Sequence, residues 1–341
     1  MIANSSGAVE EPIDAIVTWV DGNEPRHRAK LEAHLASIGR RPSSAQPTRF
    51  SSTGEIDWCI TSLVRHAPFL RRIHIVTDQQ IPAIVKRSSV WPAVLRDKLC
   101  IVDHLEIFRG HEDVLPTFNS LSIETMLFRV PGLAEQFVYF NDDFMLLRPV
   151  QPDVWFRNRH LVLRGQWRRM KGRGFFRRLG DACRDMLGAA MLEQRASYTT
   201  AQALAAQRAG FKDKFLVLEH QPHPMRRSAL EQFFDSHPQL LRNNISPRLR
   251  DASQFQAQAL AAHLALAHGE ACIEAESALL YLKPASTPAS KLRRQLDAAR
   301  NNPQLRFGCV QNLDDATADA RQLVGDALDQ WIPAIDEQFD I

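Results

Sequence analysis

The sequence predicts an α/β fold in which a mostly parallel sheet is flanked by helices, with an α-rich insertion after the central acidic strand. Apolar segments of strand length alternate with segments of helical periodicity, which is the pattern of βαβ units. With 341 residues and 45% apolar composition, the chain can bury the core of one large α/β unit or of two domains. We expect the strands of this sheet at residues 13–20, 71–78, 99–104 and 137–140.

Helical periodicity separates these strands and continues after them. Residues 55–67, for example, place Ile56, Cys59, Ile60 and Leu63 on one face. Further helices are expected at 24–38, 116–129, 182–210, 227–234 and 254–268, with a last helix ending at Trp331. A further strand at 215–218 precedes a polar, Pro-rich turn at 220–225, and a final strand with an acidic turn is expected at 307–315.

Residues 137–150 are the segment around which the chain is organised. Residues 137–140 fit a buried strand, whereas Asn141, Asp142 and Asp143 are poor strand formers and fall where the strand opens into a loop. Ligands of open α/β sheets bind at the carboxyl ends of strands. Because Mg²⁺ and Mn²⁺ prefer oxygen ligands, the two aspartates are candidate metal ligands. An Asx turn is the alternative.

A second acidic turn follows the first strand. Residues 13–20 end on Asp21-Gly22-Asn23, and a helix is expected directly afterwards. A strand, a glycine turn and a helix are the usual opening of a nucleotide-binding sheet, although the glycines here do not form the GxGxxG pattern. A plain tight turn is the alternative.

Two further stretches are expected to be loops. Residues 39–54 are rich in Ser, Pro and Gly and predict a mobile loop. Residues 157–178 contain nine Arg or Lys residues and no acid, which predicts a flexible patch that attracts anions such as a phosphorylated substrate or lipid headgroups. A solvated surface loop is the alternative for this basic stretch.

Composition excludes several classes of function. The 42 basic and 39 acidic residues leave a net charge of +3, which is too small for nucleic-acid binding by bulk electrostatics. The five cysteines are scattered and form no C-x-x-C pair, which indicates reduced thiols. No leader-like segment and no apolar run near 18 residues is present. We therefore expect a cytoplasmic protein, with a peripheral position at the inner membrane face left open.

Four groups of residues, taken together and in their order along the chain, resemble a known family. Each group alone is too short to indicate one. The first is Ile16-Val-Thr-Trp-Val-Asp-Gly22. The second comprises Arg49-Phe, Glu55, Arg65-His-Ala-Pro68, Ile73–Asp78, Leu115–Glu124 and Tyr139–Phe144; the third is His220-Gln-Pro-His-Pro-Met225 with Arg250 further on; the fourth is Cys309–Asp315. In this order they resemble the conserved regions of the Stealth family of sugar-phosphate transferases. That family includes bacterial capsular polysaccharide phosphotransferases and the lysosomal-targeting N-acetylglucosamine-1-phosphotransferase.

The resemblance implies a reaction and a cofactor. A hexose-1-phosphate, with N-acetylglucosamine-1-phosphate from UDP-N-acetylglucosamine as the best guess, would pass to a hydroxyl of an oligo- or polysaccharide acceptor. The products would be a phosphodiester and UMP, in capsular or cell-surface polysaccharide synthesis. The resemblance also implies a nucleotide-sugar-binding sheet of the GT-A or Rossmann-like kind, with Mg²⁺ or Mn²⁺ on Asp142 and Asp143. No nucleic-acid partner is implied, and the oligomeric state is left open.

Site residues follow from the same resemblance. His220 is the candidate general base and Arg250 the candidate cation at the transferring phosphoryl group, together with Asp142 and Asp143 as catalytic residues. A structural histidine and a surface arginine are the respective alternatives. Candidate substrate-binding residues are Asp21, Gly22, Arg49, Asn119, Asn141 and His223. Asn119 alternatively caps its helix, and His223 is a second candidate for base or phosphate ligand.

On this interpretation the chain has four parts. Residues 1–12 form a flexible N-terminus, 13–150 the nucleotide-sugar and metal-binding core, 151–215 a basic and helical insertion on the acceptor side, and 216–341 a C-terminal part that completes the site and the sheet. Two other functions compete. One is a metal-dependent glycosyltransferase that releases nucleoside diphosphate, and the other is a non-enzymatic nucleotide-sugar sensor or membrane-surface module.

Overall fold

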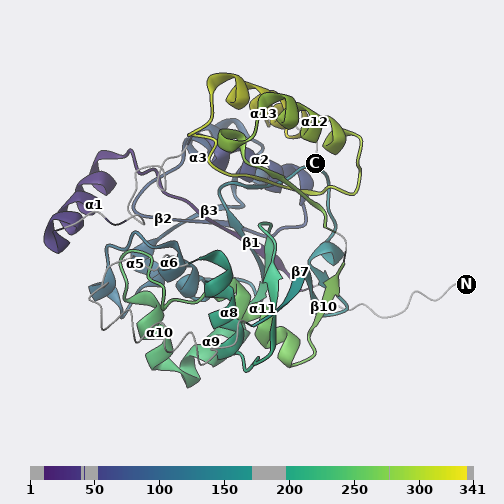
Figure 1. The fold of residues 1–341 in the computed structure, drawn as a ribbon. Helices are drawn as coiled ribbons and strands as arrows, with labels where there is room; N and C mark the ends of the chain where they lie inside the picture. Colours follow the sequence, from purple (N-terminus) through teal and green to yellow (C-terminus); the bar gives the residue numbers. More distant parts are fainter. Residues whose placement is uncertain (1–10, 40–41, 43–52, 171–196, 276, 336–341) are drawn as a thin grey trace, which may run out of the picture.

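The computed structural model describes residues 11–39, 42, 53–170, 197–275 and 277–335. Its largest sheet lies at the centre of the molecule between helices (Figure 1). In spatial order this sheet contains β3 (Leu99–Asp103), β2 (Ile73–Thr77), β1 (Ile13–Thr18), β4 (Gln136–Asn141) and β9 (His223–Arg226). The first four strands are parallel and β9 is antiparallel to β4. The predicted α/β fold with a mostly parallel, helix-flanked sheet is confirmed.

The central strands are apolar on both faces because helices cover both sides of the sheet. Ile16 and Val17 of β1, Ile75 of β2 and Phe137 and Phe140 of β4 are all fully buried. In Figure 1, α2 and α3 lie on one side of these strands, and α5, α6 and α9 to α11 lie on the other. The helices of this part are α2 (Glu55–His66), α3 (Ala83–Arg87), α4 (Ala93–Arg96), α5 (His104–Ile107), α6 (Ser120–Met126), α8 (Tyr198–Arg208), α9 (Arg227–Ser236), α10 (Pro238–Ile245) and α11 (Ala257–Ala267).

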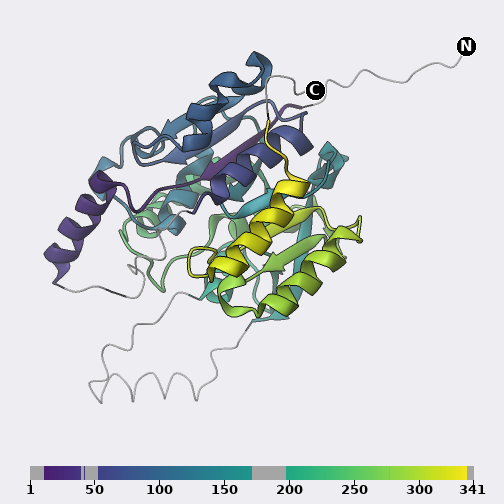
Figure 2. The same ribbon diagram turned by 90° about the horizontal axis from the view of Figure 1, so that it is seen from above.

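Helix α1 (Pro25–Ile38) reaches away from the body of the molecule (Figures 1 and 2). It begins after Glu24, whose carboxylate accepts a hydrogen bond from the backbone N–H of His27 at 2.7 Å. It ends at Gly39 in the left-handed conformation that glycine adopts without strain. Leu31 and Leu35 pack on Phe118, so one face of the projecting helix is still buried.

A second hydrophobic cluster lies beside the main core. It is built by α12 (Ala289–Arg300), α13 (Ala318–Trp331) and a three-stranded sheet of β11 (Leu279–Leu282), β12 (Phe307–Val310) and β5 (Phe144–Leu146). Figure 2 shows α12 and α13 side by side. Because β5 follows β4 after two residues, this sheet starts directly at the acidic turn.

The structure corrects two predicted loops. Residues 160–169 of the basic stretch form the strand β7 (His160–Arg169), which pairs with β6 (Phe156–Arg157), β8 (Lys214–Leu218) and β10 (Ala271–Glu274). The apolar run Leu161–Leu163 is buried in this sheet. It was not predicted as a strand because many arginines surround it in the sequence. At Gly165 a side chain would meet the carbonyl oxygen of Val217 at 2.3 Å, so the close strand pairing requires glycine there. Residues 171–178 lie outside the described residues.

The second correction concerns residues 220–225, which were predicted as a Pro-rich turn. Their second half is β9, whose residues 223–226 pair with β4. A proline fits here because β9 is the edge strand of the sheet.

Within the described residues, no helix has the length and apolar character needed to cross a membrane.

Asp14 joins three segments at the amino end of the sheet. It is fully buried in β1 and accepts hydrogen bonds from the Arg71 guanidinium at 2.6 and 2.9 Å, the His74 ring at 3.2 Å and the Ala134 backbone N–H at 2.8 Å. Burial alone would raise the pKa of Asp14, but these hydrogen bonds outweigh burial and lower the pKa to about 2.

We expect Asp14→Asn to lower the free energy of unfolding by roughly 3 kcal/mol at pH 7, because a buried ion pair is broken on one side. A lowered folded-state pKa stabilises the protein above the unfolded-state pKa near 4, and this stability is lost as the pH falls toward 2. The difference in the free energy of unfolding between wild type and Asp14→Asn, measured by urea titration, should therefore decrease by roughly 1 kcal/mol from pH 6 to pH 3. The exposed Asp97→Asn is the control, and a pH-independent advantage of wild type would contradict this assignment.

Candidate active site at the carboxyl edge of the sheet

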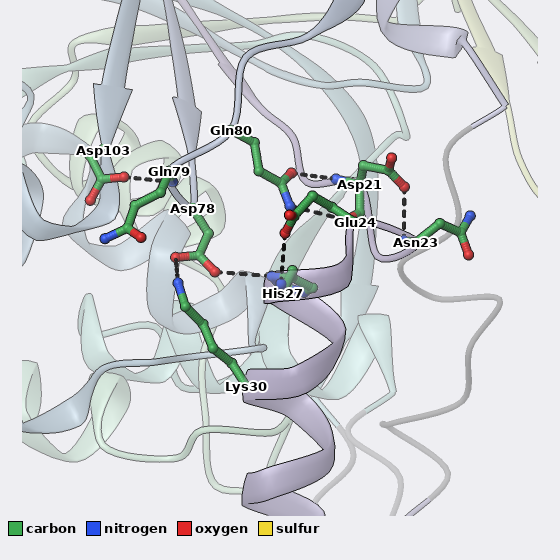
Figure 3. A network of polar contacts seen from close by, with 9 residues as sticks. All are labelled: Asp21, Asn23, Glu24, His27, Lys30, Asp78, Gln79, Gln80 and Asp103. Carbon is green, nitrogen blue, oxygen red and sulfur yellow. Dashed lines mark hydrogen bonds and ion pairs between the residues drawn. The ribbon is translucent and has the colours of Figure 1, made fainter.

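The parallel register brings the carboxyl ends of four strands to one edge. Thr18 of β1 is level with Asn141 of β4, and Thr77 of β2 is level with Asp103 of β3. Polar side chains follow each strand at this edge, and Figure 3 shows those beyond β1, β2 and β3. This edge is where open α/β sheets bind ligands.

Asp142 and Asp143 form the two-residue turn between β4 and β5. Both side chains are half-buried. Asp143 Oδ2 lies 3.7 Å from Cys309 Sγ on β12, and Asp143 Oδ1 is buried without a hydrogen-bond partner in the structure. The turn therefore holds its carboxylates between two sheets, where they are partly shielded from water.

The electrostatics of this turn favour a cation. Burial raises the pKa of Asp142 well above its ordinary value, and the negative charges of Asp143 and Glu55 raise it further. Burial and Glu55 raise the pKa of Asp143 to about 7. Glu55, the first residue of α2, is itself buried and receives hydrogen bonds from the backbone and hydroxyl of Thr53. Each of these carboxylates would be stabilised by nearby positive charge.

The residues present fit a divalent cation held by two carboxylates. Asp143 Oδ1 offers an unused oxygen, and Asp142 stands next to it in the same turn. Mg²⁺ commonly takes one or two carboxylates and completes its coordination with water and substrate phosphate. Among the described residues, no group of three or more His, Cys, Asp or Glu side chains could hold a metal ion, so a cation here would depend on such non-protein ligands.

Hydrogen bonds through Tyr139 connect Asn141 to Glu124 on α6, the helix that Arg250 contacts. The Tyr139 hydroxyl makes hydrogen bonds with Asn141 Oδ1, with Thr18 Oγ1 at 3.0 Å and with Glu124 Oε1 at 3.4 Å. The exposed Arg250 donates to Ser120 Oγ at 2.6 Å, one helical turn before Glu124.

Glu124 is a buried acid that we did not assign from the sequence. Its Oε2 has no hydrogen-bond partner in the structure, and burial raises its pKa against the opposing effect of the Arg250 charge. It stands in the segment Leu115–Glu124 that resembled the family, and a glutamate among the buried positions of α6 was the signal that could have identified it.

His220 lies between two tyrosine rings. Its ring centroid is 4.1 Å from that of Tyr198 and 5.3 Å from that of Tyr281. Tyr281 on β11 is next to Cys309 in the strand pairing, and Cys309 contacts Asp143. Burial, and then the charge of Lys283, lower the pKa of His220, which keeps the imidazole neutral at pH 7 and able to accept a proton.

Two series of contacts run between the predicted residues. Arg250 reaches Asn141 through Ser120, Glu124 and Tyr139, and His220 reaches Asp143 through Tyr281 and Cys309. Asp21 lies beyond the neighbouring strand β1, where its Oδ1 accepts from the backbone N–H of Asn23 at 2.8 Å and so forms an Asx turn around Gly22.

Three other predicted substrate-binding residues are not linked to the site by these contacts. Asn119 is fully buried, caps α6 and donates to Pro247 O and Gln254 Oε1, each at 2.8 Å; this is the capping alternative, and its amide is occupied by protein groups. His223 is buried in β9, and burial together with the His220 charge lowers its pKa to about 3, which disfavours a cationic phosphate ligand. Arg49 lies outside the described residues.

The sequence is similar to two described regions of one family. The region described as "Stealth protein CR1, conserved region 1" matches residues 11–38, and "Stealth protein CR2, conserved region 2" matches residues 49–163. The correspondence of residues 220–225 and 309–315 to a third and a fourth region stays a prediction.

Curated relatives match over different lengths. An exopolysaccharide phosphotransferase of Streptomyces coelicolor, SCO2594, is 28% identical over 97% of this chain and 52% of its own length. Another from that organism, SCO6021, is 41% identical over 46% of this chain and 27% of its own length. The capsular polysaccharide phosphotransferase WcwK of Streptococcus pneumoniae is 37% identical over 42% of this chain and 41% of its own. This chain thus spans about a quarter to a half of the length of these relatives.

Among solved structures, the galactosyltransferase LgtC in complex with donor and acceptor sugar analogs aligns over 95% of this chain and 98% of its own length. Its sequence identity is 12% and its TM-score is 0.45.

Asp143→Asn should raise the melting temperature of the metal-free protein at pH 8 by a few degrees, because a raised folded-state pKa means that the charged carboxylate destabilises the fold above pH 7. Added Mg²⁺ or Mn²⁺ should then stabilise wild type more than the variant in calorimetric scans. Asp153→Asn, which changes an aspartate outside this turn, is the control. Equal metal-induced shifts in wild type and Asp143→Asn would contradict a cation at this turn.

Proposed function

We propose, from the premise that this chain is a Stealth-family protein carrying conserved regions 1 and 2, that it transfers a sugar-1-phosphate from a nucleotide sugar to a carbohydrate hydroxyl. Capsular or exopolysaccharide synthesis is the proposed setting, and an oligo- or polysaccharide is the proposed acceptor. The observation that carries the proposal is the contact path that joins Arg250, Asn141, Asp143 and His220 at the carboxyl edge of the sheet.

The proposed reaction exchanges one phosphorus–oxygen bond for another. The acceptor oxygen forms a bond to the phosphorus that carries the sugar, and the bond from that phosphorus to the bridging oxygen of the nucleotide breaks. His220 takes the proton of the acceptor hydroxyl, and UMP leaves when the donor is UDP-N-acetylglucosamine. Burial and then the charge of Lys283 lower the pKa of His220, so the imidazole is unprotonated and can accept the proton of the hydroxyl.

Charge neutralisation is the second requirement of phosphoryl transfer. Arg250 is exposed, and its guanidinium is suited to bind two phosphate oxygens at once. Asp142 and Asp143 are the proposed ligands of Mg²⁺ or Mn²⁺, which would neutralise the diphosphate when bound. Asp21 and Gly22, at the end of the neighbouring strand, are proposed to contact the nucleotide.

The nucleotide product tests this function. We expect incubation with UDP-N-acetylglucosamine, Mg²⁺ and an oligosaccharide acceptor to release UMP, and mass spectrometry of the product should show an added sugar phosphate. A parallel screen of other uridine and guanosine nucleotide sugars would identify the donor if it is not UDP-N-acetylglucosamine. Release of UDP with transfer of an unphosphorylated sugar would replace the proposal by the glycosyltransferase alternative. Binding without turnover of any donor would favour a sensor.

His220→Ala should lower kcat by roughly 10²–10⁴-fold and change donor affinity little, because general-base assistance acts in the transition state. The exposed His160, whose Nδ1 contacts only the carbonyl of Asn158 among the hydrogen bonds of the described residues, supplies the control His160→Ala. Steady-state kinetics and calorimetric titration with the donor separate the two effects. A change confined to donor affinity would assign His220 to binding instead.

A further inference from the structure

The amide of Gln80 holds the backbone of Asp21 at both of its polar groups. The Asp21 N–H donates to Gln80 Oε1 at 2.7 Å, and Gln80 Nε2 donates to the Asp21 carbonyl at 3.0 Å (Figure 3). Gln80 is only 7% exposed, so these bonds are shielded from water. A side-chain amide here makes the two hydrogen bonds that a neighbouring strand would make, at a point where β1 has already ended.

The segment that carries Gln80 is itself fixed to the next strand. Gln79 has a φ of 56°, a left-handed conformation that is uncommon outside glycine. Its backbone N–H donates to Asp103 Oδ2 at the end of β3, at 2.6 Å. The ends of β3, β2 and β1 are therefore connected in series by side chains that bind backbone groups.

The far side of the Asp21 turn is anchored as well. The turn leads into α1, whose His27 and Lys30 contact the carboxylate of Asp78 at 3.0 and 2.8 Å. Asp78 follows β2 directly and is nine-tenths buried. Residues 21–24 are thus attached to the end of β2 on both sides, by Gln80 and by the Asp78 pairs (Figure 3).

We propose that Gln80 is a positioning residue for the donor: its amide keeps the Asp21 turn in the shape that receives the nucleotide. This inference rests on the proposed function. Gln80 does not need to touch the donor, because it acts through the backbone of Asp21. Its loss should weaken nucleotide binding while the chemical groups at β4, β9 and the Arg250 segment stay in place.

The test compares Gln80→Met, which keeps the length of the side chain but removes both hydrogen bonds, with Gln239→Met as a matched control. Gln239 is exposed and its amide bonds only Asn243 among the hydrogen bonds of the described residues. We expect the Kd for UDP, with GDP as a second probe, to rise roughly tenfold in Gln80→Met, because binding must then order the Asp21 turn that the amide held beforehand. At saturating donor, kcat should stay within about twofold of wild type. Hydrogen exchange at the Asp21 amide should accelerate.

A second variant guards against a folding defect. Gln80→Glu keeps an acceptor for the Asp21 N–H and removes the donor to the Asp21 carbonyl, so it should leave Asp21 protected from exchange and weaken UDP binding less than Gln80→Met does. Unchanged UDP affinity in Gln80→Met, or a fall in kcat at unchanged affinity, would overturn the inference while the proposed function stands. Failure of wild type to bind either nucleotide would refute the proposed donor site and this inference together.

Discussion

Burial of two carboxylates in one turn, with a third carboxylate nearby, is the constraint on which the candidate site depends. Asp142 and Asp143 are adjacent in sequence, face Glu55 at the start of α2 and lie between two sheets. Their raised pKa values mean that the folded protein destabilises the charged form of both carboxylates. Such an arrangement is typical of sites whose remaining charge comes from a ligand, because functional groups are where perturbed pKa values concentrate.

The two candidate residues outside the acidic turn, His220 and Arg250, are positioned by different means. The candidate base His220 stacks on the ring of Tyr281 and contacts the tilted ring of Tyr198, and its burial lowers its pKa. Arg250 stays exposed, and the segment around it is held by Asn119, which binds Pro247 and Gln254 on either side of Arg250. The buried Asn119 therefore contributes to the position of the guanidinium without being available to a substrate.

Sequence patterns predicted the core of the fold because its signals are local. The apolar runs that became β1, β2 and β4 end on acidic residues, and the parallel register then placed those residues at one edge. The strands β7 and β9 were missed because β7 contains three arginines and β9 a proline, and their strand character comes from pairing with distant segments. The roles of Tyr139, Tyr281 and Glu124 depend on three-dimensional contacts that no local pattern encodes.

The antiparallel strand β9 closes the sheet next to β4. Until residues 223–226 have been synthesised and paired, β4 is an edge strand that offers the backbone of Gln136–Asn141, with its run of aromatic side chains, to any other chain. Pairing of residues 223–226 with β4 covers this edge, and the candidate base His220 precedes the pairing segment by three residues.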